Sequence, residues 1–191
     1  MAERRIVLVR HGETEWSRDG RHTGVTDIPL TEAGRKQAAQ LRSPLGGRRF
    51  ALVLTSPLRR AEETCRLAGF GSQAKPRPDL KEWDYGHYDG LTSAQIRATS
   101  PDWSLWRDGG PGGESAADVG RRVDRVIAEA GSADGDVLLF AHGHVLRVLA
   151  ARWLGQPPEA GRFYALGTAA WSVLGQEHDQ PVMEHWNLPP A

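Results

Sequence analysis

Three short apolar runs in this sequence are each followed by residues that could bind or attack an anion. Arg10 and His11 follow the first run, and His142 follows the third. The second run leads into a helical segment that carries the pair Arg59-Arg60. Guanidinium groups are forked donors that suit phosphate oxygens, and neutral imidazole is a nucleophile near pH 7. Together these residue types predict an anion-binding site that contains two histidines.

Each of these features also has a plainer interpretation. A histidine followed by glycine after a strand is more often a turn, and an arginine pair on a helix is more often a solvated face. Their recurrence at the same kind of position favours one shared site. A metal site formed by His11, His142 and His144 is the rival interpretation, because imidazole is a common metal ligand. The arginines would repel a cation, so we expect no metal.

The elements that must position these residues alternate between strands and helices. Buried strands are predicted for three apolar, β-branched or leucine-rich runs, residues 6–9, 52–54 and 137–140. Helical spacing and capping residues predict helices over 31–42, 57–68, 92–95, 115–130 and 145–154. Weaker strand patterns cover 163–166, 170–174 and 182–186, and loops are expected at 71–79 and 109–113. The chain is therefore expected to be an α/β protein whose mainly parallel sheet is covered on both faces, with ligands bound at the carboxyl ends of the strands.

Length and composition limit the number of domains, the partners and the location that can be expected for this chain. A length of 191 residues fits a single domain, residues 1–191. Lys plus Arg and Asp plus Glu both number 24, and this zero net charge argues against a nucleic-acid partner. No apolar run approaches the roughly 20 residues that span a bilayer, so no membrane partner is expected. The single cysteine, Cys65, excludes an internal disulfide, and the apolar run near the N-terminus is too short for a signal-peptide core, so we expect a cytoplasmic protein.

Several motifs together resemble the histidine phosphatase superfamily, the phosphoglycerate-mutase-like proteins. They are R-H-G-E-T at 10–14, G-R-H-T-G-V-T-D-I-P-L-T-E-A-G at 20–34, S-P-L-R-R-A at 56–61, E-W-D-Y-G at 82–86 and H-G-H at 142–144. The similarity covers about residues 5–154 and is strongest to small acid phosphatases and sugar-phosphate phosphatases, including sedoheptulose-bisphosphatases. It implies a three-layer α/β/α fold, no cofactor and no metal.

The resemblance also implies a role for each matching residue. His11 would be the nucleophile, and Arg10 and Arg60 would hold the phosphate. His142 would be the second histidine of the pocket, and Glu82 would donate a proton to the leaving group. Asp84 and Asp89 remain alternative donors. Further substrate contacts are expected from positions in the same motifs, namely Ser17, Thr23, Gly24 and Gly143.

The reaction implied is hydrolysis of a small phosphorylated metabolite through a phosphohistidine. Attack on a phosphate dianion requires that its charge be cancelled and that the nucleophile lie in line with the leaving oxygen. A cofactor-dependent phosphoglycerate mutase is the alternative. Such mutases resemble this chain but are longer and carry an arginine pair after the glutamate motif, where this sequence has only Arg97 and Arg107.

The substrate-facing wall is the least specified part of the site. It is expected from the Gly-rich loop at 109–113 and from aromatic residues between the motifs, Trp83, Tyr85, Tyr88, Trp103 and Trp106. Arg107 with that loop could meet a second phosphate, whereas Arg147 could equally meet one or be a surface charge. The C-terminal strands and their tryptophans leave a homodimer open as an alternative to a monomer.

Overall fold

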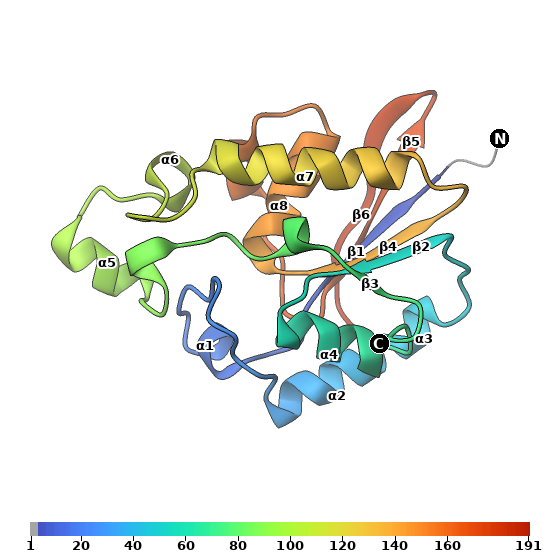
Figure 1. The fold of residues 1–191 in the computed structure, drawn as a ribbon, viewed down its shortest axis with the longest axis horizontal. Coiled ribbons are helices and arrows are strands. Elements are labelled where there is room, and N and C mark those ends of the chain that lie inside the picture. Colours follow the sequence, from blue (N-terminus) through green and yellow to red (C-terminus); the bar gives the residue numbers. More distant parts are fainter. Residues whose placement is uncertain (1–3) are drawn as a thin grey trace.

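The apolar runs become the central strands of one sheet (Figure 1). The computed structural model describes residues 4–191, so the first three residues of the expected domain lie outside the described part. The strand order is β3-β2-β4-β1-β5-β6. β1 to β4 are mutually parallel, and β5 and β6 are antiparallel to their neighbours. The strands are β1 (Ile6–Arg10), β2 (Leu52–Thr55), β3 (Lys75–Pro76), β4 (Val137–Ala141), β5 (Trp171–Glu177) and β6 (Gln180–Leu188).

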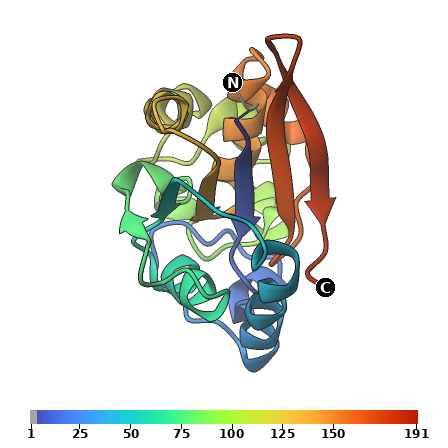
Figure 2. The same cartoon turned by 90° about the vertical axis from the view of Figure 1, so that its right-hand side faces the viewer.

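Side-chain alternation along the strands divides the core in two. Ile6 and Leu8 of β1 belong to a cluster with α7 (Ala116–Gly131) and α8 (Gly143–Trp153). Val7 and Val9 belong to a second cluster on the other face. That face is covered by α2 (Glu32–Gln40), α3 (Arg42–Leu45) and α4 (Arg59–Leu67) (Figures 1 and 2). Because successive strand residues point to opposite faces, an unbroken apolar run is what a sheet between two helical layers requires.

The remaining elements lie mostly beyond the carboxyl ends of β1 and β4. This region contains α1 (Glu15–Arg18), α5 (Ser93–Thr99) and α6 (Leu105–Asp108) (Figure 1). Short 3₁₀ turns cover Pro78–Leu80, Gly86–Tyr88 and Pro158–Phe163. In residues 4–191, no helix combines the length and the apolar character that crossing a membrane would require.

The structure confirms the expected α/β architecture and corrects several boundaries. A strand over 163–166 is wrong: the chain there leaves a 3₁₀ turn and continues as irregular structure. α4 begins at Arg59, although Ser56 was expected to cap it, and the Ser56 hydroxyl contacts His142 instead. α8 begins at Gly143, two residues before its predicted start. The two later C-terminal strand patterns are confirmed as β5 and β6, both longer than expected.

Candidate active site

The ends of β1 and β4 bring two histidines together. Arg10 pairs with Ala141 in the parallel ladder, and the His11 N–H extends it by donating to the Ala141 carbonyl at 3.0 Å. Beyond this point the chain from β1 goes to the α2 layer, and the chain from β4 enters α8 on the opposite face. A crevice forms where neighbouring parallel strands diverge in this way. The His11 and His142 ring centroids are 5.2 Å apart.

The hydrogen bond at its Nδ1 atom fixes the tautomer of His11. Nδ1 lies 2.7 Å from the Gly12 carbonyl oxygen, which can only accept, so Nδ1 carries the proton. In the neutral ring this leaves the lone pair on Nε2. Burial, followed by the charges of Arg60 and Arg10, lowers the pKa of His11 well below 6.5. The ring is therefore an unprotonated nucleophile at neutral pH.

The loop that carries His11 is held by a close backbone approach to α2. A Cβ atom at Gly12 would lie 2.3 Å from the Gly34 carbonyl oxygen, so no larger residue fits. The Gly12 N–H donates to the Thr64 hydroxyl of α4 at 3.0 Å. Contacts on both sides thus fix the backbone immediately after the nucleophile.

Arg10 is a buried cation that has an unused hydrogen-bond donor. Its Nη1 atom donates to the Leu166 carbonyl. Its buried Nε atom has no hydrogen-bond partner among the described residues. Burial lowers the pKa of this guanidinium, and the charge of Glu82 partly opposes that shift. An unpaired buried N–H is costly, so Arg10 is suited to receive an anionic oxygen.

The N-terminus of α8 adds backbone donors to the same place. Glu82 Oε2 accepts from the His144 N–H at 3.0 Å, and Glu82 Oε1 accepts from the Val145 N–H at 2.9 Å. No acceptor within residues 4–191 takes the N–H of Gly143, the first residue of α8. A helix N-terminus favours negative charge. Gly143 therefore offers an N–H to an anion beside His11.

Of the three candidate proton donors, Glu82, Asp84 and Asp89, Glu82 alone lines the cavity. Its side chain is nearly buried, and Oε1 also accepts from the Trp83 N–H at 2.9 Å. Oε2 accepts one N–H only, which leaves a position for a proton. Asp84 instead accepts from the Gly86 N–H at 2.9 Å, and Asp89 accepts from the Gly24 N–H at 2.7 Å. Both aspartates stabilise turns away from the cavity.

Arg60 and His142 lie behind the cavity surface and are fully buried. Arg60 Nε donates to His142 Nδ1 at 3.1 Å, so His142 carries its proton on Nε2 and donates it to the Ser56 hydroxyl at 2.7 Å. Arg60 also donates to the carbonyls of Thr23 and Gly24 at 3.1 and 2.8 Å. Burial and the Arg60 charge lower the pKa of His142 well below 6.5. Direct contact of either residue with phosphate stays a prediction.

The other expected contact residues divide between the cavity and its support. Ser17 and Thr23 line the cavity, whereas Gly24 lies beneath it. The Ser17 hydroxyl accepts from the Thr14 N–H at 2.9 Å within the capping box of α1. The Thr23 hydroxyl donates to the Arg21 carbonyl at 3.3 Å. Contact of Ser17, Thr23 and Gly24 with substrate stays a prediction.

The cavity has a volume of about 180 Å³ and a cationic rim. Besides His11, Glu82 and Tyr85, charged and titratable side chains line it from the end of β1, from the loop after α1 and from α8: Arg10, Arg21, His22, His144 and Arg147. The Arg147 guanidinium carbon lies 4.7 Å from the centre of the Trp106 ring, and Nε donates to the Gly161 carbonyl at 3.0 Å. The alternative that Arg147 is a surface charge is therefore wrong.

Much of the expected substrate wall lies elsewhere. Of the aromatic residues, Tyr85 alone lines the cavity, and the Gly-rich loop at 109–113 does not reach it. Arg107 is exposed and pairs with its neighbour Asp108 at 2.8 Å. Sequence patterns cannot show this, because both features depend on how the 84–115 segment folds back on itself.

A tyrosine–histidine pair was not foreseen in the sequence. The Tyr85 hydroxyl lies 2.6 Å from His144 Nδ1. Burial and the Glu82 charge raise the pKa of Tyr85 well above 10, and burial together with Arg147 lowers the pKa of His144 well below 6.5. The neutral phenol therefore donates to the neutral imidazole. The only sequence signal was the second histidine of H-G-H.

The rival metal interpretation would require a group of ligand side chains around His11, His142 and His144. Within residues 4–191, no group of three or more His, Cys, Asp or Glu side chains is arranged to hold a metal ion. The charges of Arg60 and Arg10 act on both His11 and His142.

Comparison with known sequences gives one family. Residues 6–189 match the model of the histidine phosphatase superfamily, branch 1. The chain is 43% identical to an acid phosphatase of Mycobacterium tuberculosis over 178 residues, which cover 91% of this chain and 87% of the relative. It is 35% identical to a sedoheptulose 1,7-bisphosphatase of Saccharomyces cerevisiae over 183 residues, covering 79% and 68% of the two chains.

Solved structures agree with the sequence comparison. A structure from Mycobacterium tuberculosis superposes with a TM-score of 0.93 at 40% identity and covers 98% of this chain and 99% of that one. A mycobacterial glucosyl-3-phosphoglycerate phosphatase in complex with VO3 superposes with a TM-score of 0.87 at 34% identity, covering 97% and 99%. The similarity therefore extends over nearly the whole fold.

Proposed function

The chain belongs to the histidine phosphatase superfamily and is a phosphatase, and from this premise we propose that it hydrolyses small phosphorylated metabolites through a phosphohistidine at His11. The state of His11 is the observation that carries the proposal. Its proton is held on Nδ1 by the Gly12 carbonyl, its pKa is lowered, and its Nε2 lone pair is free. Because Arg10 lies beside it with an unpaired buried Nε, the same place offers both a nucleophile and an anion donor.

In the first step the Nε2 lone pair attacks phosphorus, and the bond to the leaving oxygen breaks. The electron pair of that bond goes to the leaving oxygen, which takes a proton from Glu82 Oε2. Arg10 Nε and the Gly143 N–H stabilise the phosphoryl oxygens as charge develops on them. Glu82 lines the same cavity as His11 and Arg10, which supports it as the donor.

In the second step water attacks the phosphohistidine. Glu82 takes the proton that water loses, and the P–N electron pair returns to Nε2, which releases inorganic phosphate. Arg60 and His142 contribute from behind the cavity. The Arg60 charge keeps His11 unprotonated, and its bonds to the Thr23 and Gly24 carbonyls hold the loop that forms one wall.

The size and charge of the cavity support a small, highly anionic substrate. Its volume of about 180 Å³ is below the roughly 300–1,000 Å³ that is usual for drug-sized ligands. Arg21 and Arg147 lie on the rim beyond Arg10, and neither pairs with a carboxylate among the described residues. A sugar phosphate with a second anionic group, as the name of the yeast relative describes for that protein, fits such a rim.

Two further proposals concern the location of the protein and its partners. Equal numbers of acidic and basic residues support an enzyme that does not bind nucleic acid. The single cysteine supports a cytoplasmic location, and the lack of a long apolar run supports an enzyme without a membrane partner. The long strand β6 lies at the edge of the sheet and has β5 as its one strand neighbour among the described residues, which supports homodimerisation through the C-terminal hairpin.

The activity is tested by steady-state phosphate release from a panel of phosphomonoesters. The panel contains an aryl phosphate, glycerol phosphate, sugar monophosphates and sugar bisphosphates, each with and without 2,3-bisphosphoglycerate and EDTA. We expect hydrolysis that is independent of both additions and fastest with a doubly anionic sugar. Isomerisation of phosphoglycerate that depends on 2,3-bisphosphoglycerate would identify a mutase instead, and loss of activity in EDTA that divalent ions restore would refute the mechanism.

A further inference from the structure

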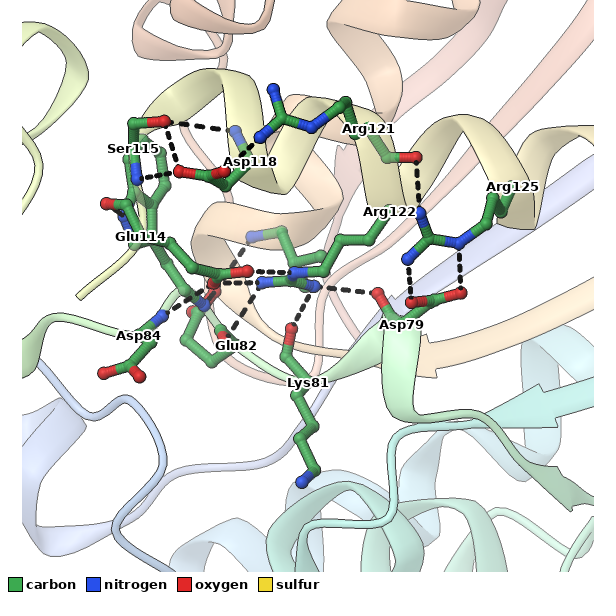
Figure 3. Close-up of polar contacts among 12 residues, drawn as sticks. Asp79, Lys81, Glu82, Asp84, Glu114, Ser115, Asp118, Arg121, Arg122 and Arg125 are labelled. Atoms are coloured by element: carbon green, nitrogen blue, oxygen red, sulfur yellow. Dashed lines mark hydrogen bonds and ion pairs between the residues drawn. The ribbon is translucent and has the colours of Figure 1, made fainter.

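A buried arginine lies directly behind the segment that carries Glu82. Arg122 extends from α7 toward the backbone of residues 79–82 (Figure 3). Its Nη1 atom donates to the Asp79 and Lys81 carbonyls at 2.8 and 2.7 Å, and Nη2 donates to the Glu82 carbonyl at 3.2 Å. One guanidinium therefore holds three carbonyls of a segment whose backbone has no strand partner at these positions.

Glu114 completes this arrangement from the other side. Its carboxylate accepts from Arg122 Nε at 2.8 Å and from Nη2 at 2.9 Å, which is a bidentate ion pair. Its Oε2 atom also accepts from the Asp84 N–H at 3.0 Å. The Glu114 N–H donates to the Asp84 carbonyl at 2.9 Å, and the Glu114 carbonyl accepts from the buried Trp83 indole N–H at 2.8 Å. Glu114 thus contacts the two residues that follow Glu82 through three of its own polar atoms: Oε2, the backbone N–H and the carbonyl oxygen.

The Gly-rich loop makes this contact sterically feasible. A Cβ atom at Gly113 would lie 2.2 Å from the Asp84 carbonyl oxygen, so only glycine allows the two backbones to approach so closely. The loop at 109–113 therefore packs against the Glu82 segment and does not line the substrate cavity. The motif G-G-E at 112–114 therefore supports the Glu82 segment and takes no direct part in the reaction.

We propose that the Arg122–Glu114 pair positions Glu82 for proton transfer to the leaving group. This inference rests on the proposed function, in which Glu82 is the donor. The Glu82 side chain is fixed on its cavity side by the N–H groups of His144 and Val145. Its backbone is fixed on the opposite side by Arg122, so its carboxyl group is held between α8 and α7. Proton transfer needs donor and acceptor within about 2.6–3.2 Å, and such precision requires a rigid support.

The neighbouring ion pair on α7 shows what distinguishes this one. Arg125 pairs with Asp79 at 2.6 Å one turn further along the helix (Figure 3). Its side chain is 63% exposed, whereas that of Arg122 is 10% exposed. Arg125 donates to the Asp79 carboxylate and to the Arg121 carbonyl of its own helix, but to no carbonyl of the Glu82 segment. Arg125 is therefore a matched control on the same helix and against the same segment.

The substitution Glu114→Gln tests the proposal with little change in shape. Either orientation of the amide turns its NH₂ group toward an N–H of Arg122 or Asp84, so the support loosens. We expect kcat for glycerol phosphate, which has a poor leaving group, to fall about 10-fold or more with KM little changed. We expect kcat for an activated aryl phosphate, which needs no proton donor, to fall less than about 2-fold. Arg125→Lys is expected to leave both values unchanged.

The ratio of the two kcat values is the decisive readout, because the folded fraction of a destabilised variant cancels from it. Arg122→Lys, which keeps the charge but loses the bidentate geometry, should shift the ratio in the same direction. In a Glu82→Gln background, Glu114→Gln should shift the ratio no further, since a positioning residue acts only through the residue that it positions.

Each outcome assigns the pair to one role. An unchanged ratio in Glu114→Gln, losses that multiply in the double variant, or absence of folded protein for both single variants would assign the pair to folding alone and overturn the proposal. If Glu82→Gln itself leaves the ratio unchanged, the proposed donor is wrong. If Glu82→Gln shifts the ratio and Glu114→Gln does not, only the positioning inference fails.

Discussion

His11 and Glu82 face the same cavity but are held there by different kinds of structure. His11 follows a central strand, extends the β1–β4 ladder, and lies between two helical layers. Glu82 lies in an irregular segment that a side-chain ion pair and a helix N-terminus hold in place. The nucleophile is held by the strand ladder and by contacts of the backbone at Gly12, whereas the segment of the proton donor is held by a side-chain ion pair. Changes near His11 should therefore abolish the reaction, and changes near Glu82 should alter it selectively.

The largest expected effect is loss of the nucleophile. His11→Asn removes the Nε2 lone pair while keeping a polar side chain of similar width, so kcat should fall by at least ~10³-fold for every substrate. The sheet does not depend on the imidazole, so the circular dichroism spectrum and Tm should stay close to those of the parent. His185→Asn, on the exposed edge strand β6, serves as the control and should keep full activity. Turnover within tenfold of the parent in His11→Asn would contradict the assignment of the nucleophile.

A selective effect is expected on the opposite side of the cavity. The amide in Glu82→Gln cannot supply a proton, so kcat for alkyl phosphates should fall by about 10²-fold or more, and kcat for activated aryl phosphates by much less. The measurement is a plot of log kcat against the leaving-group pKa, whose slope should steepen. Asp84→Asn, which lies off the cavity, should leave the slope unchanged. Parallel losses across the whole series would remove Glu82 as the donor.

The smallest expected effect concerns stability and pH. Burial and Arg60 hold the pKa of His142 well below 6.5 in the folded protein. Below pH 6.5 the unfolded chain takes up a proton that the folded chain does not, so stability is lost as pH falls, by up to about 1.4 kcal/mol per pH unit for this group. His142→Gln, which does not titrate, should show a shallower loss of unfolding free energy in urea between pH 6.5 and 5. An equal slope in both proteins would contradict the buried neutral state.

The same contrast explains what the sequence could and could not predict. The strands over 6–9 and 137–140 are unbroken apolar runs, and the rule that ligands bind at strand ends was sufficient to place His11 beside His142. The capping box of Thr92 and Gln95 likewise needs only local spacing and is confirmed at α5. Regular elements with local signals are therefore readable from sequence alone.

The position of Glu82 depends on contacts between segments that are distant in the sequence, and no local sequence pattern indicates such contacts. In the sequence, Arg122 has the pattern of an exposed helical arginine and Glu114 that of a loop glutamate. Only the packing of α7 against residues 79–84 makes them a buried pair. Packing also places Arg147 at the cavity, whereas Arg107, which was expected there, does not line it. The false strand over 163–166 failed for a related reason, because a short apolar pattern does not distinguish a strand from a turn that packs on α8.

In the proposed mechanism the His11 imidazole carries the phosphoryl group during turnover. This mechanism is tested by mixing the enzyme with a phosphomonoester radiolabelled in its phosphoryl group and quenching in alkali, where phosphohistidine survives, within the first turnover. We expect label on the peptide that contains His11, and none in His11→Asn. Turnover without any trapped label in the parent protein, or label on a different residue, would contradict it.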